Sequence, residues 1–226
     1  MAAPVLVFDL DGTLVDSAPD LIDTLNLIMS RIGVESLPFA EGRALIGGGA
    51  KLLIERALAR RHTTTRQSEI DELFEAFIAH YAEHIADRSR PFPGLETALD
   101  RLAADGFRLA VCTNKLEWLA RRLLDALDLT PRFAFICGQD TFATRKPDPQ
   151  VLRLTVDKAG GGAEDTIMVG DSITDIRTAQ AAGVPVIAVD FGYTDIPVSE
   201  LGADRVISHF AELRDAVSLL RNKPGK

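Results

Sequence analysis

The chain has 226 residues, of which 46% are hydrophobic and 26% are charged, and its formal net charge is -8. This composition is typical of a globular protein and excludes a largely disordered chain, while the length allows one large domain or one domain with an insertion. The acidic balance disfavours non-specific binding to nucleic acid or to anionic membranes, so we expect neither as a partner.

The sequence contains no sign of a membrane anchor or of a disulfide framework. No stretch reaches the roughly 20 apolar residues that cross a bilayer, and the first residues lack the basic region of a signal peptide. The two cysteines, Cys112 and Cys137, both occur within apolar runs that read as strands. We therefore expect a cytoplasmic protein whose cysteines are reduced.

The first predicted element is a strand at residues 5–8 (VLVF), which is followed by Asp9 and Asp11. Four apolar residues without a polar break predict a strand that is buried on both faces of a parallel sheet. Side chains at i and i+2 of an extended segment point the same way, so both carboxylates would emerge at the carboxyl end of this strand. Open α/β sheets bind ligands at that end. Gly12 allows the chain to turn sharply there.

The next stretch, residues 16–87, reads as helical throughout. Apolar residues at helical spacing predict three amphipathic helices over about residues 21–32, 50–61 and 70–85. Because no strand separates them, we expect a small helical bundle.

From residue 94 onward, predicted strands alternate with predicted helices. The strands fall at residues 109–112, 133–137, 167–169, 186–189 and 205–207, and the helices at about 95–105, 116–127, 150–159, 173–182 and 211–221, with an αβ loop at 160–162. Such alternation implies a parallel sheet covered on both faces. We therefore predict a doubly wound, Rossmann-like α/β core of residues 1–15 and 88–226, into which a helical cap of residues 16–87 is inserted.

Polar side chains follow several of these strands at the point where each strand ends. The candidate site residues are Asp9, Asp11, Thr113, Asn114, Lys146, Asp171 and Asp175. Because the carboxyl ends of parallel strands meet at one crevice, we expect these side chains to lie close together.

This set of side chains is typical of phosphoryl transfer through an aspartyl phosphate. A carboxylate can attack phosphorus and divide one difficult step into two. Mg²⁺ held by oxygen ligands would join Asp9 to Asp171 and offset the charge of the transferring group. Lys146 supplies a fixed positive charge and Thr113 a donor toward phosphate oxygens. Asp11 can give a proton to the leaving oxygen and later take one from water.

Four segments resemble, in order, the four motifs of the haloacid dehalogenase-like (HAD) hydrolases. They are residues 8–17 (FDLDGTLVDS), Thr113, Lys146 with Pro147, and residues 170–175 (GDSITD). The resemblance covers essentially the whole chain, and it implies that the helical insertion is a C1-type cap.

The same resemblance implies a role for each carboxylate. Asp9 would be the nucleophile and Asp11 the general acid and base. Mg²⁺ would lie on the Asp9 carboxylate, the Asp11 backbone carbonyl and Asp171. Asp175 would support the metal or Lys146.

Further segments resemble the phosphoglycolate phosphatase family within these hydrolases. They are residues 46–50 (IGGGA), 113–115 (TNK), 137–140 (CGQD), 146–149 (KPDP), 170–172 (GDS), 192–193 (GY) and 202–207 (GADRVI). The resemblance implies Mg²⁺-dependent hydrolysis of 2-phosphoglycolate, a small phosphorylated acid, to glycolate and phosphate. Two positions depart from the family pattern, since Gln139 replaces the usual glycine and Gly48 stands where asparagine is common.

The glycine-rich segment of the cap has two open interpretations, a loop that folds over the crevice or a simple turn between helices. In the first, Gly48, Gly49 and Lys51 would contact substrate, with Arg43 as another candidate anion contact. The remaining residues expected to bind substrate are Gly12, Thr113, Asn114 and Lys146.

Other functions remain open from the sequence alone. A phosphatase for another small ester, or a mutase that moves phosphate between positions of a sugar, would use the same residues. A phospho-aspartate receiver domain agrees less well with Asp11 and the long insertion. A binding module without activity agrees less well with the complete set of Asp9, Asp11, Thr113, Lys146 and Asp171. The sequence leaves a monomer and a homodimer equally open.

Overall fold

The computed structural model describes residues 3–194 and 196–221, so residues 1–2, 195 and 222–226 of the predicted core lie outside the described residues. Its main sheet has six parallel strands in the order β5-β4-β1-β6-β7-β8. Their bounds are Ala3–Phe8 for β1, Arg108–Cys112 for β4, Phe135–Cys137 for β5, Gly161–Gly170 for β6, Val186–Val189 for β7 and Arg205–Ile207 for β8. Within the described residues, no helix is long and apolar enough to cross a membrane.

Strand β1 lies in the centre of the sheet, as its unbroken apolar run predicts. Phe8, its last residue, is opposite Val111 of β4 on one side and Val169 of β6 on the other. The chain order of the strands therefore reverses at β1. In open α/β sheets this switch point creates a crevice at the carboxyl ends of the strands.

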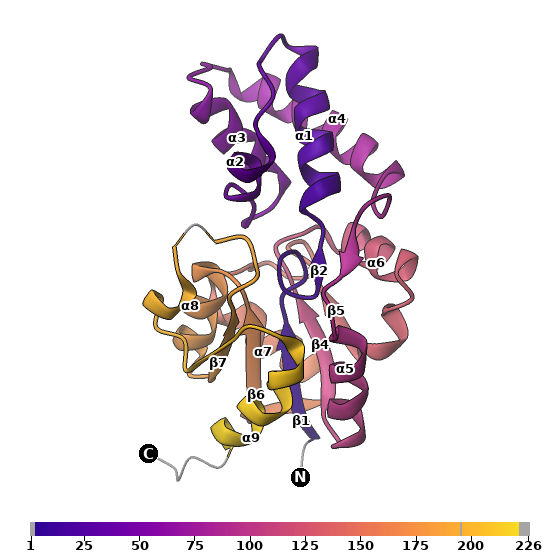
Figure 1. Cartoon of the computed structure of the whole chain (residues 1–226), viewed down its shortest axis with the longest axis vertical. Coiled ribbons are helices and arrows are strands. Elements are labelled where there is room, and N and C mark those ends of the chain that lie inside the picture. The colour runs from indigo at the N-terminus through magenta and orange to yellow at the C-terminus, as the bar shows by residue number, and fades with distance from the viewer. Residues whose placement is uncertain (1–2, 195, 222–226) are drawn as a thin grey trace.

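Helices cover both faces of the sheet (Figure 1). Leu6 and Phe8 of β1 pack on the face covered by α5 (Leu95–Ala104), α6 (Glu117–Ala126) and α9 (Leu213–Arg221). Val5 and Val7 pack on the opposite face, against α7 (Pro149–Lys158) and α8 (Ile173–Ala182). Because successive side chains of a strand point to opposite faces, one apolar run serves both cores. The predicted doubly wound α/β fold is confirmed.

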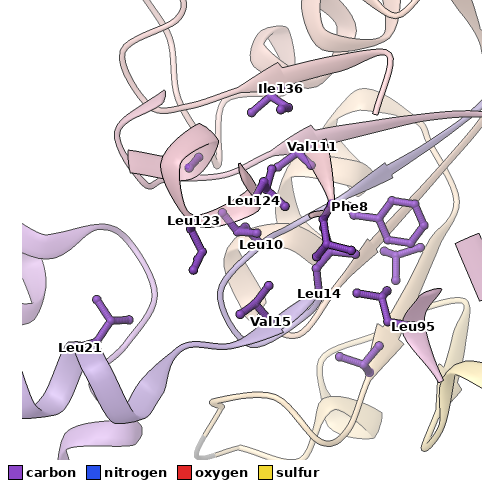
Figure 2. Close-up of a cluster of buried hydrophobic side chains, with 14 of the residues drawn as sticks. Phe8, Leu10, Leu14, Val15, Leu21, Leu95, Val111, Leu123, Leu124 and Ile136 are labelled. Carbon is purple, nitrogen blue, oxygen red and sulfur yellow. The ribbon is translucent and has the colours of Figure 1, made fainter. Parts of the chain in front are cut away.

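The turn after β1 is fixed by burial of its own apolar side chains. Figure 2 draws Leu10 and Leu14 in one cluster with Phe8 and with Leu95 of α5. Both leucines are fully buried, and the backbone N–H of Leu14 donates to the carbonyl of Leu10 at 3.0 Å. Each buried leucine stabilises this turn by roughly 1.5–3 kcal/mol. The carboxylates of Asp9 and Asp11, which flank Leu10, are thereby held in place.

Residues 18–83 form four helices above the carboxyl end of the sheet (Figure 1), which we call the cap helices. They are α1 (Ala18–Arg31), α2 (Phe39–Arg43), α3 (Ala50–Arg60) and α4 (Gln67–Glu83). The sequence predicts only three of them. Helix α2 was missed because its 5 residues are too few to show helical periodicity. The division of the chain into cap and core at residues 16–87 stays a prediction.

Further elements differ from the sequence prediction, among them β5, which begins at Phe135 and not at residue 133. Strand β6 begins at Gly161, inside the predicted loop at 160–162, and Gly161 pairs with Ala3. A Cβ at Gly161 would lie 2.0 Å from Cγ2 of Val5, so the absence of a side chain at Gly161 leaves room for the side chain of Val5. The last predicted helix begins as a 3₁₀ turn at Phe210–Glu212 and becomes α-helical at Leu213.

The chain crosses between the cap helices and the sheet twice, at neighbouring positions. Strand β2 (Val15–Asp16) pairs with β3 (Arg90–Pro91) in antiparallel fashion. The buried carboxylate of Asp20, on α1, accepts hydrogen bonds from the backbone N–H groups of Arg88 and Ser89 and from the Ser89 hydroxyl at 2.6 Å. This carboxylate joins the outgoing crossing to the returning one.

We expect Asp20→Ala to lower the free energy of unfolding by about 2–3 kcal/mol, because it leaves the buried backbone N–H and hydroxyl of Ser89 without an acceptor and removes the bond from the backbone N–H of Arg88. Chemical denaturation monitored by circular dichroism measures the change. Asp23→Ala is the matched control, since Asp23 lies on the same helix, is exposed and pairs with Arg88 only at the surface. That variant should lose less than about 1 kcal/mol. Equal losses in the two variants would contradict the conclusion that the Asp20 carboxylate stabilises the two crossings between the cap helices and the sheet.

Candidate active site

Asp9 lies one residue beyond the end of β1, at the switch point of the sheet. Its backbone N–H donates to the carbonyl of Val169 at 2.9 Å, which continues the pairing of β1 with β6. Its carboxylate oxygen Oδ1 lies 2.9 Å from Nζ of Lys146, and its side chain retains 13% of its exposure. The carboxylate is therefore held by a cation but still reachable from the crevice.

Lys146 is a buried ammonium between two carboxylates. Its Nζ lies 2.9 Å from Asp9 and 2.6 Å from Asp175. Burial alone would lower the pKa of Lys146, but the charges of Asp175 and Asp9 outweigh burial and raise it, so the side chain stays charged. Asp175 is fixed in turn by Ser172, which precedes α8 and donates to it from its hydroxyl at 2.6 Å and its backbone N–H at 3.1 Å.

Asp171 is buried and held by donors from two other parts of the chain. The backbone N–H of Tyr193 donates to Oδ2 at 2.8 Å, and the hydroxyl of Thr13 donates to Oδ1 at 3.0 Å. Gly12 approaches the same carboxylate so closely that a Cβ would lie 2.4 Å from Oδ2. The φ of Gly12 is +86°, a conformation that other residues rarely adopt. Gly12 therefore belongs to the packing around Asp171.

The carboxylates of Asp9, Asp171 and Asp175 form a cluster that fits a divalent cation. One oxygen from each lies within 4.8 Å of the others. Burial, together with the smaller effect of the Asp175 charge, raises the pKa of Asp9 to about 6 in spite of Lys146, and raises that of Asp171 to about 8. The cluster has three carboxylates, of which Asp9 and Asp175 contact the ammonium of Lys146, so its fully ionised form carries an excess of buried negative charge. An all-oxygen donor set of this kind is the one Mg²⁺ prefers.

The carboxylate of Asp11 contacts a different set of partners. Lys115 donates to its two oxygens at 2.9 and 3.0 Å, and the hydroxyl of Ser17 donates to Oδ1 at 2.5 Å. The side chain of Asp11 is not a member of the carboxylate cluster. It is therefore available for a different task from that of Asp9, two residues earlier.

Thr113 and Asn114 lie just beyond the end of β4. The backbone N–H of Thr113 donates to the carbonyl of Cys137, and its hydroxyl accepts from the backbone N–H of Lys115 at 3.2 Å. The amide nitrogen of Asn114 donates to the carbonyl of Lys146 at 3.1 Å. The amide oxygen of Asn114 is buried and has no partner within the described part of the chain. Both residues face the same cavity as Asp9.

A cavity of about 60 Å³ lies between the cap helices and the sheet. Its polar lining contains the side chains predicted from the sequence, namely Asp9, Asp11, Thr113, Asn114 and Lys146. A wider hollow of about 720 Å³ shares Asp9 and Asp11 and is bordered by Asp171 and, from the cap, Arg56, Arg60 and His62. The two carboxylates after β1 thus lie where both hollows meet.

Two of the predicted substrate contacts in the cap line the cavity, and one does not. Gly48 and Gly49 belong to its wall, and a Cβ at Gly49 would lie 2.9 Å from the carbonyl oxygen of Asn114. The loop therefore folds onto the end of β4, as the first interpretation predicts. Lys51 does not line the cavity, because its ammonium forms an ion pair with Asp71 of α4.

Arg43, the other candidate anion contact, joins the cap to the core. It donates to the carbonyls of Phe191 and Gly192 at 2.7 and 2.6 Å, and its guanidinium lies 5.2 Å from the ring centroid of Tyr193.

The sequence analysis missed several residues that support the site. They are Thr13, Ser17, Tyr81, Lys115 and Tyr193. Thr13 and Ser17 belong to the first motif, and Lys115 follows Thr113 and Asn114 directly, so their positions were a usable signal. Tyr81 lies in the apolar stripe of a helix, where a buried tyrosine is indistinguishable from a core residue.

The site can be compared with known proteins. Residues 6–189 match the family model for haloacid dehalogenase-like hydrolases. A phosphoglycolate phosphatase of Mesorhizobium japonicum is 49% identical over 213 residues, which are 94% of this chain and 94% of that protein. A phosphoglycolate phosphatase of Agrobacterium fabrum is 48% identical over 215 residues, or 95% of this chain and 92% of the relative.

Solved structures agree with these sequence matches. The crystal structure of a predicted phosphoglycolate phosphatase from Haemophilus somnus 129PT has a TM-score of 0.88 at 29% identity, with 95% of this chain and 97% of that chain covered. The chain therefore belongs to the haloacid dehalogenase-like hydrolases, the family that its four motifs predict.

Proposed function

We propose that this chain is a Mg²⁺-dependent phosphatase that hydrolyses 2-phosphoglycolate to glycolate and phosphate, with the phosphoryl group carried in between by Asp9. As a member of its family, the chain is a phosphoric monoester hydrolase. The observation that carries the proposal is the contact of a reachable carboxylate, Asp9, with the buried ammonium of Lys146 beside two further carboxylates. The names of the similar proteins from Mesorhizobium and Agrobacterium support the choice of substrate.

The nucleophile in this proposal is the carboxylate of Asp9. An oxygen of Asp9 forms a bond to phosphorus while the bond from phosphorus to the ester oxygen breaks. Lys146, at 2.9 Å from Asp9, offsets the charge that gathers on the phosphoryl oxygens, and Thr113 offers a hydroxyl on the same side of the cavity. Water then attacks the phosphoryl group on Asp9 and releases phosphate.

The residues that would hold Mg²⁺ are Asp9, Asp171 and the backbone carbonyl of Asp11, with Asp175 as a supporting carboxylate. The oxygens of the three carboxylates lie within 4.8 Å of one another, which supports this choice. The bound ion would draw electron density from the phosphoryl oxygens and reduce their repulsion of Asp9.

Asp11 moves the protons in this proposal. It gives one to the leaving oxygen of the ester and takes one from the water that attacks in the second step. Its carboxylate is separate from the carboxylate cluster and lines the cavity next to Asp9, which supports this division of roles. Ser17 and Lys115 hold it in one orientation.

Residues 16–87 act as a cap domain in this proposal, closing over residues 1–15 and 88–226. Gly49 lies against the carbonyl of Asn114 at the end of β4, and Gly48 and Gly49 are part of the wall of the cavity that Asp9 and Asp11 line. A small ester cannot close the crevice by itself, so exclusion of water depends on the cap. This arrangement supports a small substrate.

We expect Asp9→Asn to abolish turnover, because an amide oxygen cannot form the phosphoryl bond that a carboxylate forms. Phosphate release from 2-phosphoglycolate, hexose phosphates and an aryl phosphate, with and without Mg²⁺, measures this. The loss should reach roughly 10³-fold or more. Asp23→Asn, on the exposed face of α1, is the control and should keep full activity. Activity on other esters alone would refute the substrate and keep the mechanism, whereas turnover by Asp9→Asn would refute the mechanism.

The stability of the protein should depend on pH in a way that Mg²⁺ changes. Burial raises the pKa of Asp9 to about 6 and of Asp171 to about 8, so the folded chain binds these protons more tightly than the unfolded chain. In EDTA, the free energy of unfolding should therefore decrease as the pH rises from about 5 to about 8.

Mg²⁺ replaces the protons, so it should raise the melting temperature by several degrees at pH 8 and by less at pH 5. Scanning calorimetry at both pH values measures the difference. Asp171→Asn removes one of the two titrating groups and should flatten the pH dependence in EDTA. A Mg²⁺ effect as large at pH 5 as at pH 8 would speak against these carboxylates as the site.

A further inference from the structure

Lys115 is a buried cation that lines the cavity beside Asp11. Its side chain keeps only 6% of its exposure. Its Nζ donates to both oxygens of Asp11, at 2.9 and 3.0 Å, and to the hydroxyl of Tyr81 at 3.0 Å. The ammonium thus lies between the end of β4 and helix α4 of the cap.

The hydroxyl of Tyr81 has a free donor beside this ammonium. It accepts a hydrogen bond from Lys115, and its own proton has no acceptor among residues 3–194 and 196–221. The side chain is 1% exposed, and it lines the cavity. A buried hydroxyl proton without an acceptor is costly, so a ligand oxygen at this position would be stabilised.

The wall around Lys115 and Tyr81 is mostly apolar. It is formed by Leu21, Leu53, Phe74, Phe77, Ile78 and Leu116. Among the described residues that line the cavity, the cations are Lys115 and Lys146, and Lys146 already lies between Asp9 and Asp175. A second negative group on a substrate bound in this cavity would therefore have Lys115 as its charged partner, because Arg56 and Arg60 border the adjoining wider hollow instead.

The contact of Lys115 with Asp11 suits a substrate carboxylate close to the phosphate. In the proposed function, which this inference extends, Asp11 contacts the ester oxygen of the substrate. Lys115 is one hydrogen bond beyond Asp11. In 2-phosphoglycolate a single methylene group separates the ester oxygen from the carboxylate, so the carboxylate would reach the neighbourhood of Lys115 and Tyr81.

Lys115 can release one donor without leaving Asp11 unpaired. It gives two N–H groups to the same carboxylate, and the hydroxyl of Ser17 donates to that carboxylate as well. We propose that Lys115 and the Tyr81 hydroxyl together bind the carboxylate of the substrate and so select phosphate esters of small carboxylic acids over neutral esters. The selection depends on both sides of the cavity, since Lys115 belongs to the core and Tyr81 to the cap.

The test compares 2-phosphoglycolate with 2-hydroxyethyl phosphate, which has the same chain length but a neutral hydroxyl in place of the carboxylate. The measured quantity is the ratio of kcat/KM for the two esters. Lys115→Met should lower this ratio by roughly 10²-fold, and Tyr81→Phe by about 10-fold, because the carboxylate loses a charged or a neutral partner. Lys158→Met, an exposed lysine on α7, is the matched control and should leave the ratio unchanged.

Product inhibition gives a second readout with the same variants. Glycolate should inhibit Lys115→Met and Tyr81→Phe more weakly than the parent, whereas inhibition by inorganic phosphate should change much less. If Lys115→Met does not fold, Tyr81→Phe alone tests the carboxylate site, because this variant keeps the aromatic ring and loses only the hydroxyl.

The outcomes separate this inference from the function on which it rests. If both esters lose activity equally in the variants, Lys115 only positions Asp11 and the carboxylate site is refuted. If the parent hydrolyses the two esters equally well, the carboxylate site is refuted and the phosphatase remains. If the parent hydrolyses neither ester with Mg²⁺, the proposed function fails, and this inference fails with it.

Discussion

The site depends on a buried excess of negative charge at the carboxyl end of β1. Asp9, Asp171 and Asp175 lie within 4.8 Å of one another, and among the described residues Lys146 is the cation that contacts two of them. Burial and mutual repulsion make full ionisation of this cluster unfavourable, which is why the pKa of Asp171 rises to about 8. A divalent cation would relieve the same repulsion. The unfavourable free energy of holding three ionised carboxylates together is therefore the basis of the proposed affinity for Mg²⁺.

The position of the cap matters to the same charges, because polar contacts connect the two regions. The hydroxyl of Tyr193 accepts from the backbone N–H of Ala18 at 2.9 Å, while the backbone N–H of Tyr193 donates to Asp171. Lys115 contacts Asp11 of the core and Tyr81 of the cap. A movement of the cap helices would therefore change the surroundings of both carboxylates, so the closure of the cap that we propose would act on them directly.

Much of the fold could be predicted because its signals are local. The apolar run of β1, the alternation of strands and helices after residue 94, and the polar residues at strand ends each depend on neighbours in the sequence. The predicted sheet and its covering helices are confirmed. Helix α2 was missed because it is too short to show the helical spacing of apolar residues. The start of β6 at Gly161 was missed because it depends on a close contact with Val5, a residue remote in the sequence.

The family, the parallel α/β core, and the carboxylates and lysine expected at the strand ends could all be predicted from the amino-acid sequence, because they follow from motifs and from periodic apolar residues. Which charge pairs with which became clear from the packing of the folded chain. Asp11 pairs with Lys115, which is 104 residues later in the chain. Lys51 forms an ion pair with Asp71 and does not line the cavity. Such pairings depend on how separate elements pack, and a distance in space between remote residues leaves no periodic trace in the sequence.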